Sequence, residues 1–292
     1  MKKFLLLASV LFVVSCEKDV VEKNSISFSE KNYDEAFQLI EYWLNAQKDY
    51  ENLTGLTAMV GDEDGIIWSE AFGMANEEDL MSVENTFSIC SISKLFTSIA
   101  IMKLIEEKKI ALNDPINKLL PWFDLKQQFE NSPPLTIKSI LTHSSGLPRE
   151  SNHPYWSWPD FPFPSKEDVV KELKNQEMLY PSSKYYQYSN LGLSLLGYVV
   201  EEVSGESFED YIDKNILEPL KMKDTKTYMS KEDYGEVLSI GYSSIKRDRN
   251  RDKVNFFNAD GIAAAAGFTS NVEDLAKFAA WQMKLLNSLE KN

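Results

Sequence analysis

The sequence predicts an α+β fold, in which helices flank an antiparallel sheet and a mainly helical lobe packs beside it. Three observations indicate this arrangement. Residues 33–73 contain an amphipathic helical stretch followed by two short strands, and a long apolar segment without proline or glycine follows Phe87. Residues 113–261 carry mostly helical patterns separated by long loops. We therefore expect an α/β lobe made of residues 33–112 and 262–292, and a helical lobe between them.

The first lobe is expected to start with a helix and a hairpin. In residues 33–50 apolar side chains recur every three or four positions, which is typical of an amphipathic helix. Residues 56–60 and 66–72 have the composition of strands, and the turn residues at 62–65 join them as a tight hairpin. A buried helix should then begin near Ser91, because its apolar positions follow helical spacing.

The second lobe is expected to combine short helices with an aromatic loop. Residues 153–164 (HPYWSWPDFPFP) are too rich in proline for a helix and too apolar for a flexible linker. Their aromatic side chains would either line the substrate site or bury themselves against the protein. The other predicted helices cover residues 137–142, 165–175, 190–203, 208–217 and 272–286.

The composition argues against a nucleic-acid partner. The 292-residue chain has a net charge of −14, and no cluster of Lys and Arg is extended enough to bind phosphates. Its 43% hydrophobic and 26% charged residues are ordinary for a globular protein. The length allows one large domain or two closely packed lobes with a sizeable core.

The N-terminal segment predicts export and lipid anchoring. Lys2 and Lys3 precede an apolar run that is too short to span a bilayer and has the composition of a secretory signal. The run ends at Cys16 in a sequence that resembles a bacterial lipobox, so residues 1–16 would be a lipoprotein signal peptide and residues 17–32 a polar tether. An ordinary signal peptide is the alternative. We expect a lipoprotein of the bacterial cell envelope, periplasmic or outer-membrane, with the lipid membrane as a partner.

Ser91 and Lys94 are the first candidate catalytic pair. Positions three apart share one face of a helix, so the Ser91 hydroxyl and the Lys94 amine would be neighbours. A lysine that apolar residues desolvate has a lowered pKa and can take the proton of a serine nucleophile. Ser-x-x-Lys also begins at Ser15, Ser243 and Ser288, but only Ser91 precedes an apolar helix.

Tyr188 and Asn190 are the second pair. They lie where an irregular stretch turns into an apolar helix. A tyrosine beside an ammonium group can act as a general base and then as an acid, and the asparagine amide can contact both the lysine and a substrate. The same Tyr-x-Asn spacing occurs at Tyr50, so this pattern is weak by itself.

Taken together, these segments resemble the serine β-lactamase and penicillin-binding-protein superfamily, especially its class C-like branch. The resemblance rests on five ordered segments, Phe87–Lys94, Leu141–Pro148, Tyr188–Gly192, Glu218–Thr225 and Ala266–Leu275. It implies the β-lactamase/transpeptidase-like fold and no cofactor or metal. It also implies Ser91 as nucleophile, Lys94 and Tyr188 as general bases, and Asn190 as a contact for a small-molecule or peptide substrate.

The sequence departs from this family at the third motif. Neither Lys-Thr-Gly nor His-x-Gly occurs at a suitable place after Gly267. We therefore expect a C-terminally truncated chain whose final sheet strands are missing, so that the enzyme activity is expected of the longer parent protein. The predicted function is a serine hydrolase that cleaves a β-lactam, a D-amino-acid peptide or a short ester through an acyl-enzyme. The alternative is a non-catalytic sensor or scaffold of the penicillin-binding type.

Two other kinds of nucleophilic site are less favoured. A Ser-His-Asp triad would need His143 or His153, and in the family the segment around His143 braces a turn. Cys90 adjoins Ser91 but has no His or Lys at helical spacing, and unpaired cysteines mostly pack as small hydrophobic residues.

Overall fold

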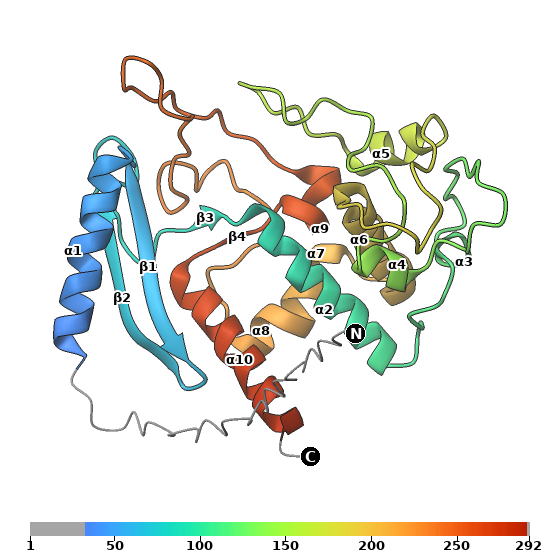
Figure 1. Cartoon of the computed structure of the whole chain (residues 1–292), viewed down its shortest axis with the longest axis horizontal. Coiled ribbons are helices and arrows are strands. Elements are labelled where there is room, and N and C mark those ends of the chain that lie inside the picture. The colour runs from blue at the N-terminus through green and yellow to red at the C-terminus, as the bar shows by residue number, and fades with distance from the viewer. Residues whose placement is uncertain (1–32, 291–292) are drawn as a thin grey trace, which may run out of the picture.

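The structure is a computed structural model that describes residues 33–290 (Figure 1). The predicted signal peptide, the tether and Cys16 lie outside the described residues. Within these residues, no helix has both the length and the apolar character needed to cross a membrane.

A helix and a hairpin form one side of the molecule. Helix α1 covers Asp34–Tyr50, strand β1 covers Gly55–Asp62 and strand β2 covers Gly65–Gly73. The strands are antiparallel, and Asp62 pairs with Gly65 across a two-residue turn. The predicted helix and hairpin are therefore confirmed, with strands slightly longer than expected.

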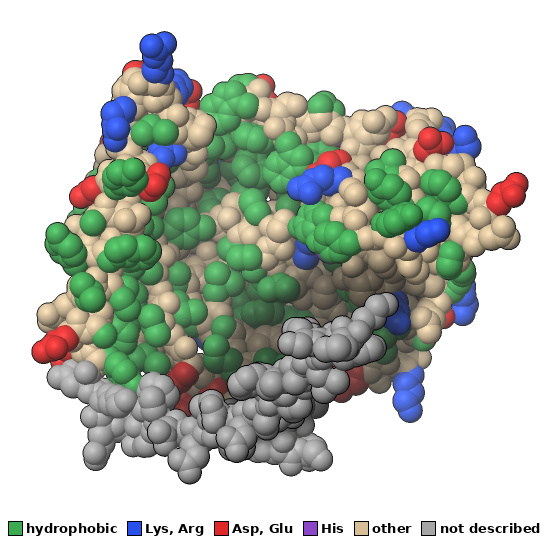
Figure 2. All heavy atoms as spheres, in the orientation of Figure 1, with side chains coloured by type: hydrophobic (Ala, Val, Ile, Leu, Met, Phe, Trp, Pro, Cys, Tyr) green, Lys and Arg blue, Asp and Glu red, His purple; other side chains and the backbone are tan. Residues whose placement is uncertain are grey.

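Helix α1 contacts the hairpin at Trp68, whose indole N–H donates to Glu41 of α1 at 3.0 Å, and the helix buries little of its surface. Phe37 stacks on Trp68 of β2 with ring centroids 5.7 Å apart. No residue of α1 is fully buried, and Leu39, Tyr42 and Trp43 are exposed. Figure 2 shows hydrophobic side chains gathered over α1 and the hairpin on this face of the molecule.

Helix α2 is the centre of the molecule. A 3-10 turn at Cys90–Ile92 leads into α2, which covers Ser93–Glu106 and packs against α6 and α9. Ile101 and Leu104 are completely buried, and Phe96 contacts the rings of Phe268 and Phe278. Burial of these apolar side chains is the main free-energy gain that holds α2 in place.

The helical elements between α2 and α9 largely follow the prediction. They are α3 at Ile116–Leu119, α4 at Ile137–Leu141, α5 at Lys166–Leu173, α6 at Asn190–Ser204, α7 at Phe208–Ile212 and α8 at Glu218–Leu220. The expected helix over 208–217 is present, but its second half is a π-helix at Asp213–Leu217. Pro219 lacks the N–H that an α-helix would pair with the carbonyl of residue 215, so the turn before it widens.

The last elements return to α2. A 3-10 turn at Asp260–Ile262 leads into α9 at Ala263–Ala266, strand β4 at Thr269–Ser270 and helix α10 at Val272–Glu290. Strand β4 pairs antiparallel with β3 at Phe87–Ser88, directly before Ser91. In the part of the chain described, the sheet structure is thus two separate two-stranded antiparallel sheets.

Helices α6 and α9 cross at very short range. A Cβ atom added to Gly197 of α6 would lie 2.4 Å from the Cβ of Ala264 in α9. Only glycine permits this approach, because real Cβ atoms essentially never come so close. The position of α9, and hence of its carbonyl groups, depends on this contact.

Candidate active site

Hydrogen bonds hold the start of α2, and the residues just before it, against the segment 264–268. Ser93 Oγ accepts a hydrogen bond from the backbone N–H of Phe268 at 3.1 Å, and Thr97 donates to the Ala264 carbonyl at 2.6 Å. The N–H of Ile89 donates to the Phe268 carbonyl at 2.9 Å. These contacts hold Ser91, which is exposed, at the beginning of the helical segment.

Lys94 lies one turn along the helix and donates to Ser91. Its Nζ is 3.0 Å from Ser91 Oγ and 2.7 Å from the carbonyl oxygen of Ala265 in α9. The side chain is only 6% exposed. This burial lowers the pKa of Lys94 to about 8, although Glu150 and Cys90 partly raise it, and Arg149 contributes a smaller lowering.

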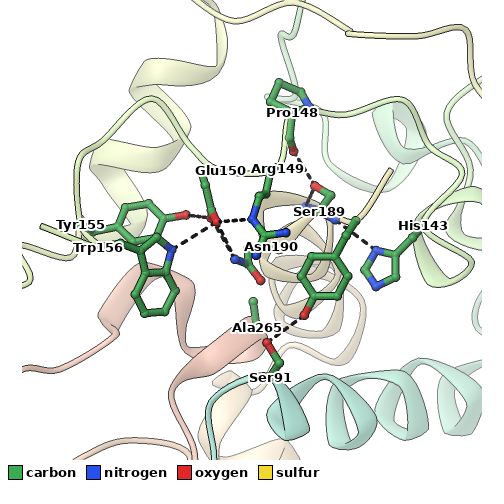
Figure 3. A network of polar contacts seen from close by, with 12 residues as sticks. Ser91, His143, Pro148, Arg149, Glu150, Tyr155, Trp156, Ser189, Asn190 and Ala265 are labelled. Carbon is green, nitrogen blue, oxygen red and sulfur yellow. Dashed lines mark hydrogen bonds and ion pairs between the residues drawn. The ribbon is translucent and has the colours of Figure 1, made fainter. Parts of the chain in front are cut away.

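Tyr188 reaches the same hydroxyl from a distant part of the chain. Its phenol donates to Ser91 Oγ at 2.8 Å, across 97 positions of sequence (Figure 3). Lys94 Nζ and the Arg149 guanidinium lie 4.9 and 5.0 Å from the centre of its ring. The predicted meeting of Ser91, Lys94 and Tyr188 is therefore present, and two cations lie beside the Tyr188 ring.

The segment Tyr188–Asn190 is clamped onto residues 143–149. Ser189 caps α6 by accepting the N–H of Gly192 at 2.9 Å, and its hydroxyl donates to the Pro148 carbonyl at 2.6 Å. The Asn190 N–H donates to the Arg149 carbonyl at 2.7 Å.

Gly146 permits the turn that this clamp requires. It adopts φ +79°, and a Cβ there would lie 2.1 Å from the Tyr180 carbonyl oxygen. The turn at Gly146 places Pro148, whose carbonyl holds Ser189, and so helps to position the neighbouring Tyr188.

His143 braces Tyr188 and does not contact Ser91 through any hydrogen bond of the structure. Its Nδ1 accepts the Ser189 N–H at 3.2 Å, and its ring packs on the Tyr188 ring with centroids 4.4 Å apart. Burial, together with the Lys94 charge, lowers the pKa of His143, which favours the neutral ring that this contact needs. His153 bonds only to Ser151 among the hydrogen bonds of its side chain. Neither the contacts of His143 nor those of His153 form a Ser-His-Asp triad, as expected.

Cys90 corrects one expectation. Its thiol is exposed and lies 3.4 Å from the Ser88 hydroxyl, whereas we expected a packed small hydrophobic residue. The residue has φ +43° at the sharp turn between β3 and the 3-10 turn, and this turn leaves the thiol on the outside.

Glu150 is the site residue that the sequence did not reveal. Its two carboxylate oxygens accept from the Asn190 amide nitrogen, at 2.8 and 3.0 Å, and one of them accepts from the Trp156 indole N–H at 3.2 Å. It also accepts the Tyr155 hydroxyl and pairs with Arg149 Nε at 3.2 Å. Figure 3 shows these donors converging on Glu150 from both sides.

The aromatic loop buries one of its rings against the protein, which was one of the two possibilities considered for it. Tyr155 is fully buried beneath Glu150, and burial together with the Glu150 hydrogen bond raises its pKa far above the ordinary value. Trp156 is 44% exposed, and its indole N–H donates to Glu150. Over residues 33–290, no group of three or more His, Cys, Asp or Glu side chains is arranged to hold a metal ion.

Comparison with known proteins identifies the family of the chain. The profile of the beta-lactamase family matches residues 44–292. Penicillin-binding protein 4* of Bacillus subtilis is 28% identical over 245 residues, which are 80% of this chain and 52% of the relative. The D-alanyl-D-alanine-carboxypeptidase/endopeptidase AmpH of Escherichia coli is 32% identical over 158 residues, which are 54% of this chain and 40% of the relative. The chain thus spans about half or less of the length of these relatives.

A solved structure shares the fold over most of the chain. The octameric penicillin-binding protein homologue from Pyrococcus abyssi superposes with a TM-score of 0.72 at 27% identity, covering 85% of this chain and 56% of that chain. The expected α+β, β-lactamase/transpeptidase-like fold is confirmed. On the family match over residues 44–292, the chain belongs to the beta-lactamase family of serine hydrolases and penicillin-binding proteins.

Proposed function

We propose that the protein is a serine hydrolase that cleaves an amide or ester through an acyl-enzyme on Ser91. The observation that carries this proposal is the contact of one hydroxyl with two potential bases, Lys94 Nζ at 3.0 Å and Tyr188 Oη at 2.8 Å. The substrate is a β-lactam, a D-amino-acid peptide or a short ester. Relatives named as a penicillin-binding protein and as a carboxypeptidase/endopeptidase support this range.

The proposed chemistry begins when a base beside Ser91 is in its proton-accepting form. Neutral Lys94, acting directly or through Tyr188, takes the Ser91 proton while Oγ bonds to the substrate carbonyl carbon. The first backbone N–H groups of the helical segment have no partner within the helix and stabilise the developing oxyanion. The same proton then passes to the leaving amine or alcohol as its bond to the carbonyl carbon breaks. Water, deprotonated by Tyr188 or Lys94, hydrolyses the ester and restores Ser91.

The proposal is tested by labelling the intact protein with a fluorophosphonate or a fluorescent penicillin and mapping the modified peptide by mass spectrometry. We expect the label on Ser91 and none in Ser91→Ala. Ser243→Ala is a matched control, because Ser243 also begins a Ser-x-x-Lys sequence and lies outside the site. A label on another residue, or no reaction with either reagent, refutes the proposal, and the second result favours a non-catalytic binding protein.

We also propose that the protein is a lipoprotein of the bacterial cell envelope, anchored through Cys16. The support is the apolar run that ends in the lipobox-like sequence before this cysteine. Metabolic labelling with a radioactive fatty acid should mark the wild-type protein and not Cys16→Ser. An unlabelled wild type overturns this proposal and leaves the hydrolase proposal untouched.

A further inference from the structure

His143 holds the segment that carries Tyr188 on both sides of this residue. The His143 carbonyl accepts the Gln187 N–H at 2.7 Å, and His143 Nδ1 accepts the Ser189 N–H at 3.2 Å (Figure 3). Between these two hydrogen bonds, the rings of His143 and Tyr188 pack with centroids 4.4 Å apart. One residue therefore fixes the main chain before and after Tyr188 and also contacts its ring.

The hydrogen bond to Ser189 defines the protonation state of the imidazole. A main-chain N–H only donates, so Nδ1 must present a lone pair, and the proton of the neutral ring must be on Nε2. A second proton would make Nδ1 a donor that faces another donor. Ser189 is 1% exposed, so little solvent reaches it to replace the lost acceptor. The folded site therefore favours neutral His143.

The charges around the imidazole also disfavour its protonation. The titratable rings that face it are those of Tyr186 and Tyr188, at centroid distances of 6.0 and 4.4 Å. Burial and the charge of Lys94 lower the pKa of His143, and a second cation, Arg149, lies 5.0 Å from the centre of the Tyr188 ring. Among the described residues, no carboxylate pairs with His143 to offset a positive charge. A charged His143 would therefore lose one of its two anchors on this segment without gaining a partner.

We propose that His143 is a positioning residue, and that its protonation releases Tyr188 from Ser91 and stops acylation in acid. This inference rests on the proposed acyl-enzyme at Ser91. It makes the loss of activity at low pH steeper than the titration of Lys94 alone would make it. Below its own pKa, Lys94 changes the rate about tenfold per pH unit, and below the pKa of His143 the loss of the neutral imidazole adds a second factor of about tenfold per unit.

The test compares the pH profile of Ser91 labelling with the titration of His143. An uncharged fluorophosphonate gives the labelling rate, and NMR of the protein with isotopically labelled histidine gives the tautomer and the pKa of each imidazole. The chain has 2 histidines, so His153→Asn assigns both sets of signals. We expect the Nε2–H tautomer of His143 at pH 8. The slope of log rate against pH should steepen from about one to about two where His143 gains its second proton.

His143→Asn separates the imidazole proton from that of Lys94. Asparagine tolerates the left-handed φ of +52° at this position, and its side-chain oxygen accepts a hydrogen bond but does not titrate. Whatever its rate at pH 8, this variant should keep a slope of about one through the acidic range. His153→Asn is the matched control, because the His153 ring bonds to Ser151 and not to the segment 187–189. Its profile should steepen as that of the wild type does.

The outcomes distinguish this inference from the proposed function. A wild-type slope that stays at about one while NMR shows His143 gaining its proton overturns the inference. An Nδ1–H tautomer, or an imidazole that stays neutral until the protein unfolds, overturns it as well. A slope of about two that persists in His143→Asn assigns the second proton to another group, with the same consequence. If Ser91 is not labelled at pH 8, the proposed function itself is refuted, whereas the NMR result does not depend on activity.

Discussion

The pKa of Lys94 sets the pH dependence of acylation. Burial lowers this pKa from 10.5 to about 8. At pH 7 the neutral fraction of the amine is then about 10%, whereas an unshifted lysine would be about 0.03% neutral, a difference of roughly 300-fold in the active form. Because the neutral amine is the base, the rate should rise about tenfold per pH unit below pH 8 and level off above it.

The assay is the second-order rate of Ser91 labelling, measured from pH 5.5 to 9.5 with an uncharged fluorophosphonate. Lys94→Met should slow labelling by roughly 100-fold or more and abolish the inflection. Lys103→Met removes a lysine from the same helix but outside the site, and it should keep both the rate and the inflection. A flat profile in the wild type, or a rate that still climbs tenfold per unit at pH 9, would refute the reasoning.

Three further changes have defined outcomes. Tyr188→Phe removes a hydroxyl 2.8 Å from the nucleophile but keeps the ring, so labelling should slow by roughly 100-fold at unchanged melting temperature; a near-normal rate would argue against its role. Gly146→Ala should lower the free energy of unfolding by about 2 kcal/mol or more, against about 1 kcal/mol for Gly205→Ala, because both have positive φ but only the first meets a backbone atom; equal losses in urea unfolding would contradict this. Phe96→Ala should cost about 3–5 kcal/mol, whereas Leu95→Ala on the exposed side should cost less than about 1 kcal/mol, and similar costs would show that α2 is oriented differently.

The parts of the site that a helix defines could be predicted from the sequence. Ser91 and Lys94 are three positions apart, and helical geometry alone makes them neighbours. Tyr188 lies 97 positions away, and its place beside Ser91 followed only from the resemblance to a family. The exposure of Cys90 was missed because it depends on a backbone angle at a turn, which the residue type does not indicate.

The rest of the site has no local signal. Glu150 is one of 45 acidic residues, and its importance comes from how the loop after Pro148 and the start of α6 bring four donor atoms to it. The carbonyl of Ala265 holds Lys94, but a carbonyl belongs to every residue. Such contacts arise from the tertiary fold, and the residue type alone does not predict them.

The crossing of α6 and α9 links a remote position to the reactivity of the lysine. Ala265 holds Lys94 through its main chain, so exchanging the side chain at 265 cannot abolish that bond, whereas moving the whole helix can. Even one methyl group at position 197 would force α9 outward, because Ala264 already occupies the space. A larger side chain at position 197 can therefore alter the activity, although this residue does not contact the nucleophile Ser91.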